Sequence, residues 1–308
     1  MIYNEDCMKI MAGLPDESID LIVTDPPYRV TSKGSAGNTG GMLQKAINKS
    51  GKVFKFNDIE CEEYAPEFFR LLKDGSHCYV MTNHVNLINM LNTFTGVGFH
   101  FIKSLIWNKG NKIMGQYYMS QFEYILFFRK GKGVKINNCG TSDIISIPNK
   151  KTKDAEGNNI HDTEKPVALM KVLIENSSKE GDTVLDPFLG VGASGIAAAA
   201  LHREFIGTEI DENYFNIAKA RIEEQCNKLT RETQRVKKKK GDATNDAFVA
   251  AINSPVFDEA IALTEKSLFN EATAPVKLSV FDEVVAAADD EDEPWILTPD
   301  DLFGGSLV

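Results

Sequence analysis

The sequence lacks the features that would place it in a membrane or a secreted class. Its uncharged, alanine- and glycine-rich stretch at 187–201 is shorter than the roughly 20 apolar residues that a membrane-spanning helix needs. No amino-terminal segment has the pattern of a signal peptide. The five cysteines include no Cys-x-x-Cys pair, so the sequence predicts neither a disulfide framework nor a zinc site. We therefore expect a cytoplasmic protein with no membrane association and no metal.

Basic residues are scarce in the carboxyl-terminal part, and this scarcity shapes the net charge of -10. From Gly241 onward there are 15 acidic and 2 basic residues, a charge of -13. Removing them from the totals of 44 and 34 leaves 29 acidic and 32 basic residues, or +3, in 1–240. The composition therefore predicts three parts: a folded domain at 1–225, a basic linker or helix end at 226–240, and an acidic carboxyl-terminal extension at 241–308.

Within 1–225, short apolar runs alternate with helical periodicity, which indicates an α/β fold with a doubly wound, mostly parallel sheet. The predicted strands are 21–24, 77–82, 102–107, 124–129, 183–186 and 205–209. Five helices are expected, around 64–72, 87–94, 169–174, 196–202 and 214–222. Gly75 is predicted to end the first of them. Two stretches without either pattern, 32–41 and 130–160, are predicted to be loops.

A short motif, Asp25-Pro26-Pro27-Tyr28, follows a predicted strand at the end where α/β folds expose ligand-binding groups. The exocyclic amine of a nucleic-acid base is a weak nucleophile, because its lone pair is delocalised into the ring. Asp25 and the carbonyl of Pro26 can accept its two hydrogens, and the prolines hold both acceptors in place. Tyr28 offers a face for a flipped-out base. The motif is therefore a candidate catalytic turn, with an ordinary Pro-Pro turn as the alternative.

A glycine-rich segment, 184–195, runs from a predicted strand into a predicted helix. Backbone amides at such a helix start can bind an anion, either a phosphate or the carboxylate of a methionine moiety. Glu209 ends the next predicted strand, 23 residues after Asp186, where it can accept hydrogen bonds from ribose hydroxyls. The segment thus predicts a cofactor site and leaves open a dinucleotide, S-adenosylmethionine or a plain glycine-rich turn.

Three motifs occur in an unusual order: residues 25–28, then His-Asp-Thr-Glu-Lys-Pro at 161–166, then Asp-Pro-Phe-Leu-Gly-Val-Gly at 186–192. In this order they resemble the β-class of S-adenosylmethionine-dependent DNA amino-methyltransferases of bacteria and phages, over about residues 1–225. The resemblance implies a Rossmann-like methyltransferase fold with permuted motifs, and S-adenosylmethionine as methyl donor. It implies double-stranded DNA as the substrate. The Asp-Pro-Pro-Tyr form implies adenine N6, since cytosine N4 enzymes more often carry Ser first.

The resemblance also implies roles for single residues. The catalytic residues would be Asp25, Pro26, Pro27 and Tyr28. The cofactor would be bound by Asp6, Cys7, Thr163, Lys165, Asp186, Pro187, Phe188, Gly190, Gly192, Ser194 and Glu209, with Asn4 near its adenine. Residues 106–110 and 123–128 would surround the target pocket, and 130–160 would be a short target-recognition segment. Ser194 departs from the family pattern, in which a hydroxyl directly follows the glycines.

Other functions stay open at this point. Cytosine N4, RNA or a protein side-chain amide would each offer a similar planar amine, although the permuted motif order disfavours the protein amide. An alternative of another class is a binding protein that holds a basic partner with its acidic extension, which the intact motifs oppose. The basic stretch 219–240 is either a DNA-backbone contact or a solvated helix face. A homodimer and a companion restriction endonuclease are open, and the expected location is the cytoplasm of a bacterium or a phage-infected host.

Overall fold

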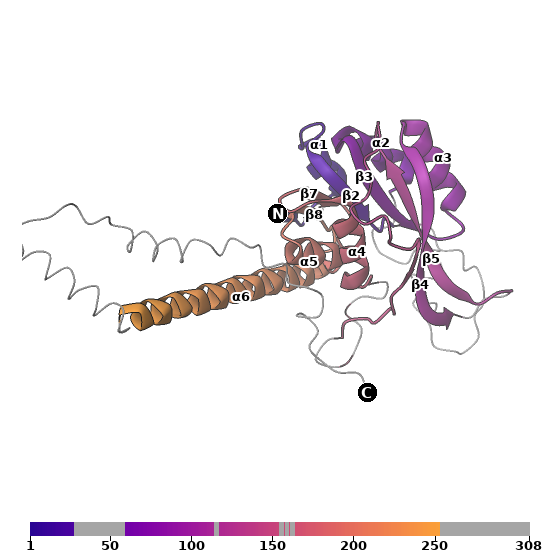
Figure 1. The fold of residues 1–308 in the computed structure, drawn as a ribbon. Coiled ribbons are helices and arrows are strands. Elements are labelled where there is room, and N and C mark those ends of the chain that lie inside the picture. The colour runs from indigo at the N-terminus through magenta and orange to yellow at the C-terminus, as the bar shows by residue number, and fades with distance from the viewer. Residues whose placement is uncertain (28–58, 114–116, 154–156, 158–159, 161–163, 253–308) are drawn as a thin grey trace, which may run out of the picture. The chain divides into compact units, whose positions relative to one another are not determined.

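The computed structural model describes residues 1–27, 59–113, 117–153, 157, 160 and 164–252 (Figure 1). The chain divides into two compact units, Met1–Lys237 and Lys238–Val308. The first unit contains the sheet and the predicted site. Of the second unit, the described residues belong to the last part of one long helix. The loop predicted at 32–41 lies outside the described residues.

The described strands form one eight-stranded sheet, in the order β1-β8-β7-β2-β3-β5-β4-β6. Among them, β5 is antiparallel to both neighbours and the other neighbouring strands pair in parallel. Their bounds are Ile2–Tyr3 (β1), Ile19–Thr24 (β2), Leu72–Thr82 (β3), His100–Ile113 (β4), Ser120–Arg129 (β5), Ile144–Ser146 (β6), Thr183–Asp186 (β7) and Glu204–Thr208 (β8). The mostly parallel sheet is as predicted.

Helices cover both faces of this sheet (Figure 1). Their bounds are Cys7–Ala12 (α1), Cys61–Leu71 (α2), Leu87–Val97 (α3), Val167–Ser177 (α4), Ala193–Ala200 (α5) and Glu212–Ile252 (α6). Successive side chains of a strand point to opposite faces, so Ile22 of β2 packs with α1, α2 and α3. Leu21 and Val23, its neighbours, pack with α4, α5 and the start of α6. This double covering confirms the doubly wound fold.

Local sequence explains where α2 begins and ends. A reciprocal pair of side-chain to backbone hydrogen bonds between Glu60 and Glu63 caps its start. Tyr64, Phe68 and other apolar residues at helical spacing then face the core. The helix ends at Leu71, because the backbone of Leu72 is already extended and opens β3. The prediction that Gly75 stops this helix is therefore wrong: Gly75 lies inside β3, with a φ of 81°.

Several other bounds differ from the sequence-based prediction. The stretch 130–160 is not loop throughout, since β6 pairs in parallel with 106–108 of β4. β1 and α1 carry too few residues to show a periodic pattern, and neither was predicted. The strand predicted at 205–209 is shifted by one residue, which leaves Glu209 just beyond it. The helix predicted at 214–222 runs on to Ile252, through both proposed domain boundaries.

The chain order of the strands reverses between β7 and β2. From β7 the sheet continues to β8, and from β2 it continues in the other direction to β3. In open α/β sheets, ligands bind outside the carboxyl ends of the strands at such a reversal. Asp25 follows the carboxyl end of β2, and Asp186 is the last residue of β7. The topology therefore brings the two sequence motifs to one edge of the sheet.

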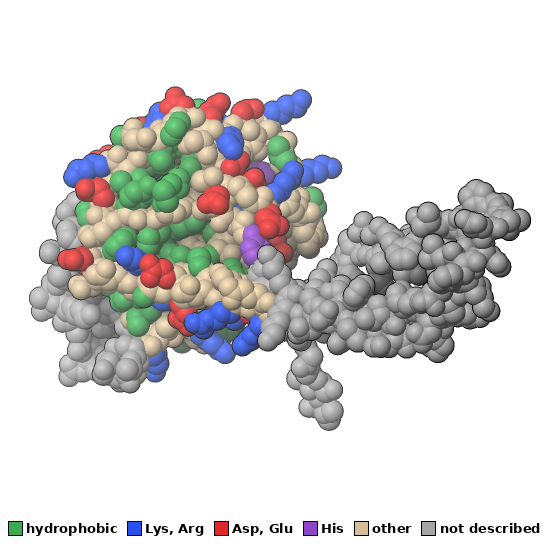
Figure 2. Space-filling model, turned by 90° about the vertical axis from the view of Figure 1, so that its left-hand side faces the viewer, with side chains coloured by type: hydrophobic (Ala, Val, Ile, Leu, Met, Phe, Trp, Pro, Cys, Tyr) green, Lys and Arg blue, Asp and Glu red, His purple; other side chains and the backbone are tan. Residues whose placement is uncertain are grey.

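The surface of the described residues carries charges of both signs. On the face that Figure 2 shows, acidic and basic side chains stand among hydrophobic ones. Within the described ranges, none of the helices combines the length and apolar composition that a membrane crossing requires.

Candidate active site

The candidate catalytic turn begins directly after β2, whose apolar residues are fully buried between the two helix layers. The side chain of Asp25 is 20% exposed. Its Oδ2 accepts a hydrogen bond from Nζ of Lys165. Its Oδ1 is buried and has no hydrogen-bond partner among the described residues. Pro26 is buried and Pro27 is half-buried, whereas Tyr28 lies outside the described residues. One oxygen of the Asp25 carboxylate is thus hydrogen-bonded, and the other has no partner among the described residues.

Asp186 connects the catalytic turn to the glycine-rich loop. Its Oδ1 accepts from the hydroxyl of Thr24 at 2.7 Å and from the backbone N–H of Phe188 at 3.1 Å. Its Oδ2 accepts from the hydroxyl of Ser194 on α5 at 2.5 Å. Burial raises the pKa of Asp186 to about 6, although the Ser194 and Thr24 hydroxyls oppose this rise. Ser194 itself is buried, so it acts on the loop through Asp186.

Glycine is required where the loop enters α5. Gly192 caps the helix with a left-handed backbone, at φ 89° and ψ 19°. A Cβ atom there would lie 3.1 Å from Cα of Ala218 on α6. Two backbone amides of the loop before α5 are engaged within the protein. The N–H of Gly192 donates to Leu189 O, and the N–H of Gly190 donates to Oε2 of Glu209 at 2.8 Å.

Glu209 lies at the same edge, one residue beyond β8. Its Oε1 accepts from the backbone N–H of Asp211 at 2.9 Å, and its Oε2 accepts from Gly190. Burial raises the pKa of Glu209 to about 7, against the effect of these two hydrogen bonds. Each carboxylate oxygen can still accept a further hydrogen bond. Glu209 therefore suits a ligand with two neighbouring hydroxyl groups, as a ribose has.

The amino-terminal segment lies beside Glu209 because β1 pairs with β8. The amide of Asn4 donates to the carbonyl of Glu209 at 2.8 Å. Asp6 caps α1 by accepting from the backbone N–H of Met8. The thiol of Cys7 is buried, and burial raises its pKa to about 12. Sheet pairing thus brings Asn4 against Glu209, and Asp6 and Cys7 follow directly in the chain at the start of α1.

Lys165 lies in the site, but toward the catalytic turn. Besides Asp25, its Nζ faces Oε2 of Glu123 at 3.5 Å. Glu123 in turn accepts from Nζ of Lys109. Burial acts to raise the pKa of Glu123, but the ammonium groups of Lys165 and Lys109 outweigh it, and this pKa lies below the usual value. Burial also raises the pKa of Asp25, against the effect of Lys165.

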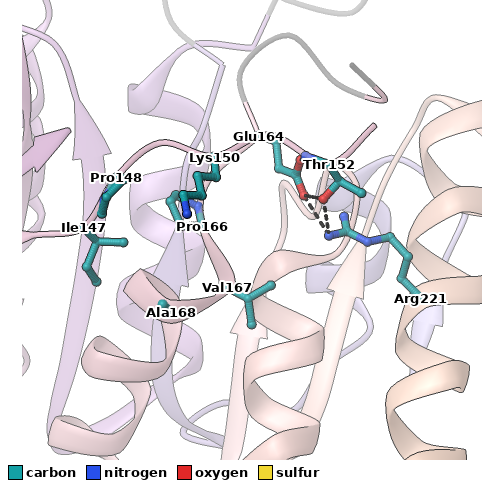
Figure 3. Close-up of a pocket in the computed structure, with 9 residues that line it drawn as sticks. All are labelled: Ile147, Pro148, Lys150, Thr152, Glu164, Pro166, Val167, Ala168 and Arg221. Atoms are coloured by element: carbon teal, nitrogen blue, oxygen red, sulfur yellow. Dashed lines mark hydrogen bonds and ion pairs between the residues drawn. The ribbon is translucent and has the colours of Figure 1, made fainter. Parts of the chain in front are cut away.

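A pocket of about 330 Å³ lies beside the segment that leads into α4 (Figure 3). Arg221 of α6 crosses one end of it. Its Nη2 donates to Oε1 of Glu164 at 2.7 Å, and its Nη1 donates to the carbonyl of Val191 at 2.6 Å. The side chain of Glu164 is only 4% exposed. The pocket is lined by Ile147, Pro148, Lys150, Thr152, Glu164, Pro166, Val167, Ala168 and Arg221.

The structure thus brings most of the predicted site residues to one edge of the sheet. The exceptions are Tyr28 and Thr163, which lie outside the described residues. The roles of Glu123 and Lys109 in the charge network were missed, although both fall in segments expected around the target pocket. The signal for Glu123 was a charged residue directly before the apolar run 124–128 of β5, whereas Lys109 gave no such signal, because β4 also contains Lys103 and Lys112. Among the described residues, no three His, Cys, Asp or Glu side chains gather as metal ligands.

A doubly wound sheet with carboxylates at the carboxyl ends of β2, β7 and β8 is typical of α/β proteins that bind a ligand at this edge. Comparison with known proteins narrows this class. The N6/N4 methyltransferase family model, described as DNA methylase, matches residues 19–220, and the chain belongs to this family.

Two curated relatives support the assignment. The Type II methyltransferase M.HinfI of Haemophilus influenzae is 31% identical over 246 residues, which cover 72% of this chain and 68% of that protein. The Type II methyltransferase M2.DpnII of Streptococcus pneumoniae is 29% identical over 244 residues, which cover 72% and 89%. The fold is also that of a solved structure, the M1.HpyAVI complex with S-adenosylmethionine, at a TM-score of 0.54 and 24% identity, covering 72% of this chain and 98% of that one. The chain is a DNA methylase of the N6/N4 family.

Proposed function

We propose that the protein is a site-specific DNA adenine methyltransferase, which transfers a methyl group from S-adenosylmethionine to N6 of a flipped-out adenine in double-stranded DNA. The buried Oδ1 of Asp25 carries this proposal. A buried carboxylate oxygen without a partner is costly unless a ligand supplies a donor. It stands beside the carbonyl-bearing Pro26 at the carboxyl end of β2. An exocyclic amine has the two N–H donors that these acceptors match.

The chain's own groups act on the amine. Asp25 and the Pro26 carbonyl accept its hydrogens and draw the nitrogen toward tetrahedral geometry, which localises the lone pair. When bound, S-adenosylmethionine supplies an electrophilic methyl carbon whose bonding pair is left on the neutral sulfur. The nitrogen forms the new bond and releases one proton, which the Asp25 carboxylate can accept. Tyr28 is proposed to stack on the flipped base.

The cofactor would lie along the edge from β7 to β8. Glu209 would accept hydrogen bonds from the ribose hydroxyls, with Asn4, Asp6 and Cys7 close to the base. Asp186 would act indirectly, since its two oxygens already hold Thr24, Phe188 and Ser194. The orphaned Asp25 Oδ1 and the free lone pairs of Glu209 fit an amine substrate and a ribose-bearing cofactor, respectively. Lys165 is placed against Asp25 rather than toward the methionine end.

We further propose a biological setting and a division of the chain for this enzyme. Both curated relatives are Type II methyltransferases by name, which supports a restriction-modification setting with a companion endonuclease. A DNA substrate implies the cytoplasm of a bacterium or of a phage-infected host. We keep residues 1–225 as the catalytic part, 130–160 as a short target-recognition segment, and 241–308 as an extension outside the catalytic fold. A homodimer stays a hypothesis.

Methylation of unmodified DNA tests the function directly. The full chain is incubated with DNA from a host without DNA methylation and with S-adenosylmethionine that carries a labelled methyl group. Digestion of the DNA to nucleosides should give labelled N6-methyldeoxyadenosine. Label in N4-methylcytosine would replace the adenine assignment, and label in neither base would refute the function. Asp25→Ala should abolish most turnover and leave cofactor affinity nearly unchanged in calorimetry, because this carboxylate acts on the target amine.

A further inference from the structure

Four charged side chains form a line that leads away from the catalytic turn. Asp25 contacts Lys165, Lys165 faces Glu123, and Glu123 contacts Lys109. The signs alternate, so the line is neutral as a whole. Lys165 is 6% exposed, Lys109 is 11% exposed and Glu123 is 19% exposed. Such burial is expensive for an isolated charge, and each member of the line therefore depends on its neighbours.

The sheet itself fixes the far end of this line. Glu123 of β5 is paired in register with Trp107 of β4, and Lys109 follows two residues later on the same strand. Nζ of Lys109 lies 5.3 Å from the centre of the Trp107 ring, which is fully buried. The indole N–H of Trp107 donates to the carbonyl of Ile147 at 2.8 Å. Lys109 and Glu123 thus stand on two rigid, paired strands, whereas Lys165 lies in the segment before α4.

We propose that Glu123 and Lys109 are positioning residues for methyl transfer: they hold Lys165 against Oδ2 of Asp25, so that Asp25 presents an ionised carboxylate with Oδ1 open to the target amine. This inference rests on the proposed function of Asp25. Glu123 shares the Lys165 ammonium with Asp25, and Lys109 neutralises Glu123. Oε2 of Glu123 faces Nζ of Lys165 at 3.5 Å as an ion pair, so its attraction competes with that of Asp25 Oδ2 for the same ammonium group.

The network makes opposite predictions for substitutions of Lys109 and of Glu123. The charged groups that face Asp25 are Lys165, Glu123, Lys109 and, from β7, Asp186. Lys109→Met removes a cation and leaves Glu123 to draw Lys165 away, so the titration midpoint of Asp25 should rise. Glu123→Gln removes a like charge, so this midpoint should fall. Each shift of the titration midpoint should be about one pH unit, which is the lower end of the range of pKa shifts that a nearby charge causes.

Two measurements read the midpoint. In the full-length, cofactor-free protein with ¹³C-labelled aspartate, the carboxyl resonance of Asp25, assigned with Asp25→Asn, is followed through a pH titration. In single-turnover methylation, the acidic limb of the pH–rate profile should move in the same two directions, with cofactor affinity unchanged. Lys109→Arg should restore the wild-type profile. Lys103→Met is the matched control, because Lys103 is on the same strand in an exposed ion pair with Asp143.

The outcomes separate this inference from the proposed function. A chain that shows opposite carboxyl shifts but methylates no DNA keeps the network and loses the function. A chain that methylates adenine while Asp25 titrates identically in Lys109→Met, Glu123→Gln and the wild type overturns the inference. So would shifts of the same sign in both variants, or an equal shift in Lys103→Met, since these would reflect a general loosening of the fold.

Discussion

The hydroxyl of Thr24 donates a hydrogen bond of 2.7 Å to Oδ1 of Asp186, which lies 162 residues later in the chain. Thr24 is the last residue of β2 and Asp186 the last residue of β7, and these two strands are paired in parallel. The bond therefore ties the strand of the catalytic turn to the strand of the glycine-rich loop. Both side chains are buried, so water cannot replace either partner.

Thr24→Val should destabilise the fold and disturb this junction. Valine has nearly the same shape but no hydroxyl, which leaves Oδ1 of Asp186 with only the N–H of Phe188. We expect the free energy of unfolding to fall by about 1.5–3 kcal/mol, the usual contribution of a hydrogen bond to a charged group. Urea denaturation measures it. Thr95→Val, at an exposed hydroxyl on α3, should change it by less than about 0.5 kcal/mol. Equal effects of the two variants would contradict this role of Thr24.

Glu209→Gln should weaken binding of S-adenosylmethionine. The neutral amide has one acceptor oxygen in place of two charged ones, and the N–H of Gly190 and that of Asp211 already compete for it. The expected loss is about 1.5–3 kcal/mol, as for hydrogen bonds to a charged group. Calorimetry with the purified variant measures the affinity. Unchanged affinity would remove Glu209 from the cofactor site.

The same residue should make the stability of the cofactor-free protein depend on pH. Burial raises the pKa of Glu209 from 4.5 to about 7, so the folded chain holds this proton more tightly than the unfolded chain. Its contribution to stability is therefore fully present below about 4.5, falls as pH rises through this window, and is lost above about 7. Calorimetric Tm values across this range should decline less in Glu209→Gln. Parallel curves would show that Glu209 titrates normally.

Arg221→Met should be strongly destabilising, because it leaves the buried carboxylate of Glu164 without its cation. Truncation of one partner of a buried ion pair costs about 3–5 kcal/mol. The carbonyl of Val191 in the glycine-rich loop also loses its donor, so cofactor affinity should fall. Lys219→Met on the same helix, at an exposed position, is the matched control. Adding Glu164→Gln to Arg221→Met should recover part of the loss in urea denaturation, and a further loss instead would refute the ion-pair explanation.

Truncation after Lys240 tests the acidic extension. The deleted segment carries a charge of -13, which repels DNA and screens the basic residues before it. We expect a folded, active enzyme whose DNA affinity at low salt is equal or higher, with any gain shrinking as salt screens the charges. Binding titrations at several salt concentrations provide the measurement. An insoluble or inactive product would show that the apolar residues of 241–308 belong to the catalytic fold or to a subunit interface.

The sequence by itself determined the fold class and the candidate carboxylates at the strand ends. Continuous apolar runs in β2, β7 and β8 indicate strands that are buried on both faces, and this pattern is local. Asp25, Asp186 and Glu209 were each recognised as candidates because each stands where such a run ends, the place where α/β folds expose ligand-binding groups. Strands as short as β1 and β6 contain too few residues for a recognisable apolar pattern. Helix α6 continues beyond the apolar residues that predicted it. Those bounds therefore did not follow from local periodicity.

Only the tertiary structure decided which charges meet. Lys165 and Asp25 are 140 residues apart, and no local rule relates them. Glu123 and Lys109 fall in segments that were expected around the target pocket, but only the register of β4 and β5 and the position of the segment before α4 place Glu123 against both Lys109 and Lys165. The physical reason is the sequence distance over which each interaction acts. Backbone periodicity is set by neighbouring residues, whereas an ion pair depends on the distance between side chains that only the complete sheet brings together.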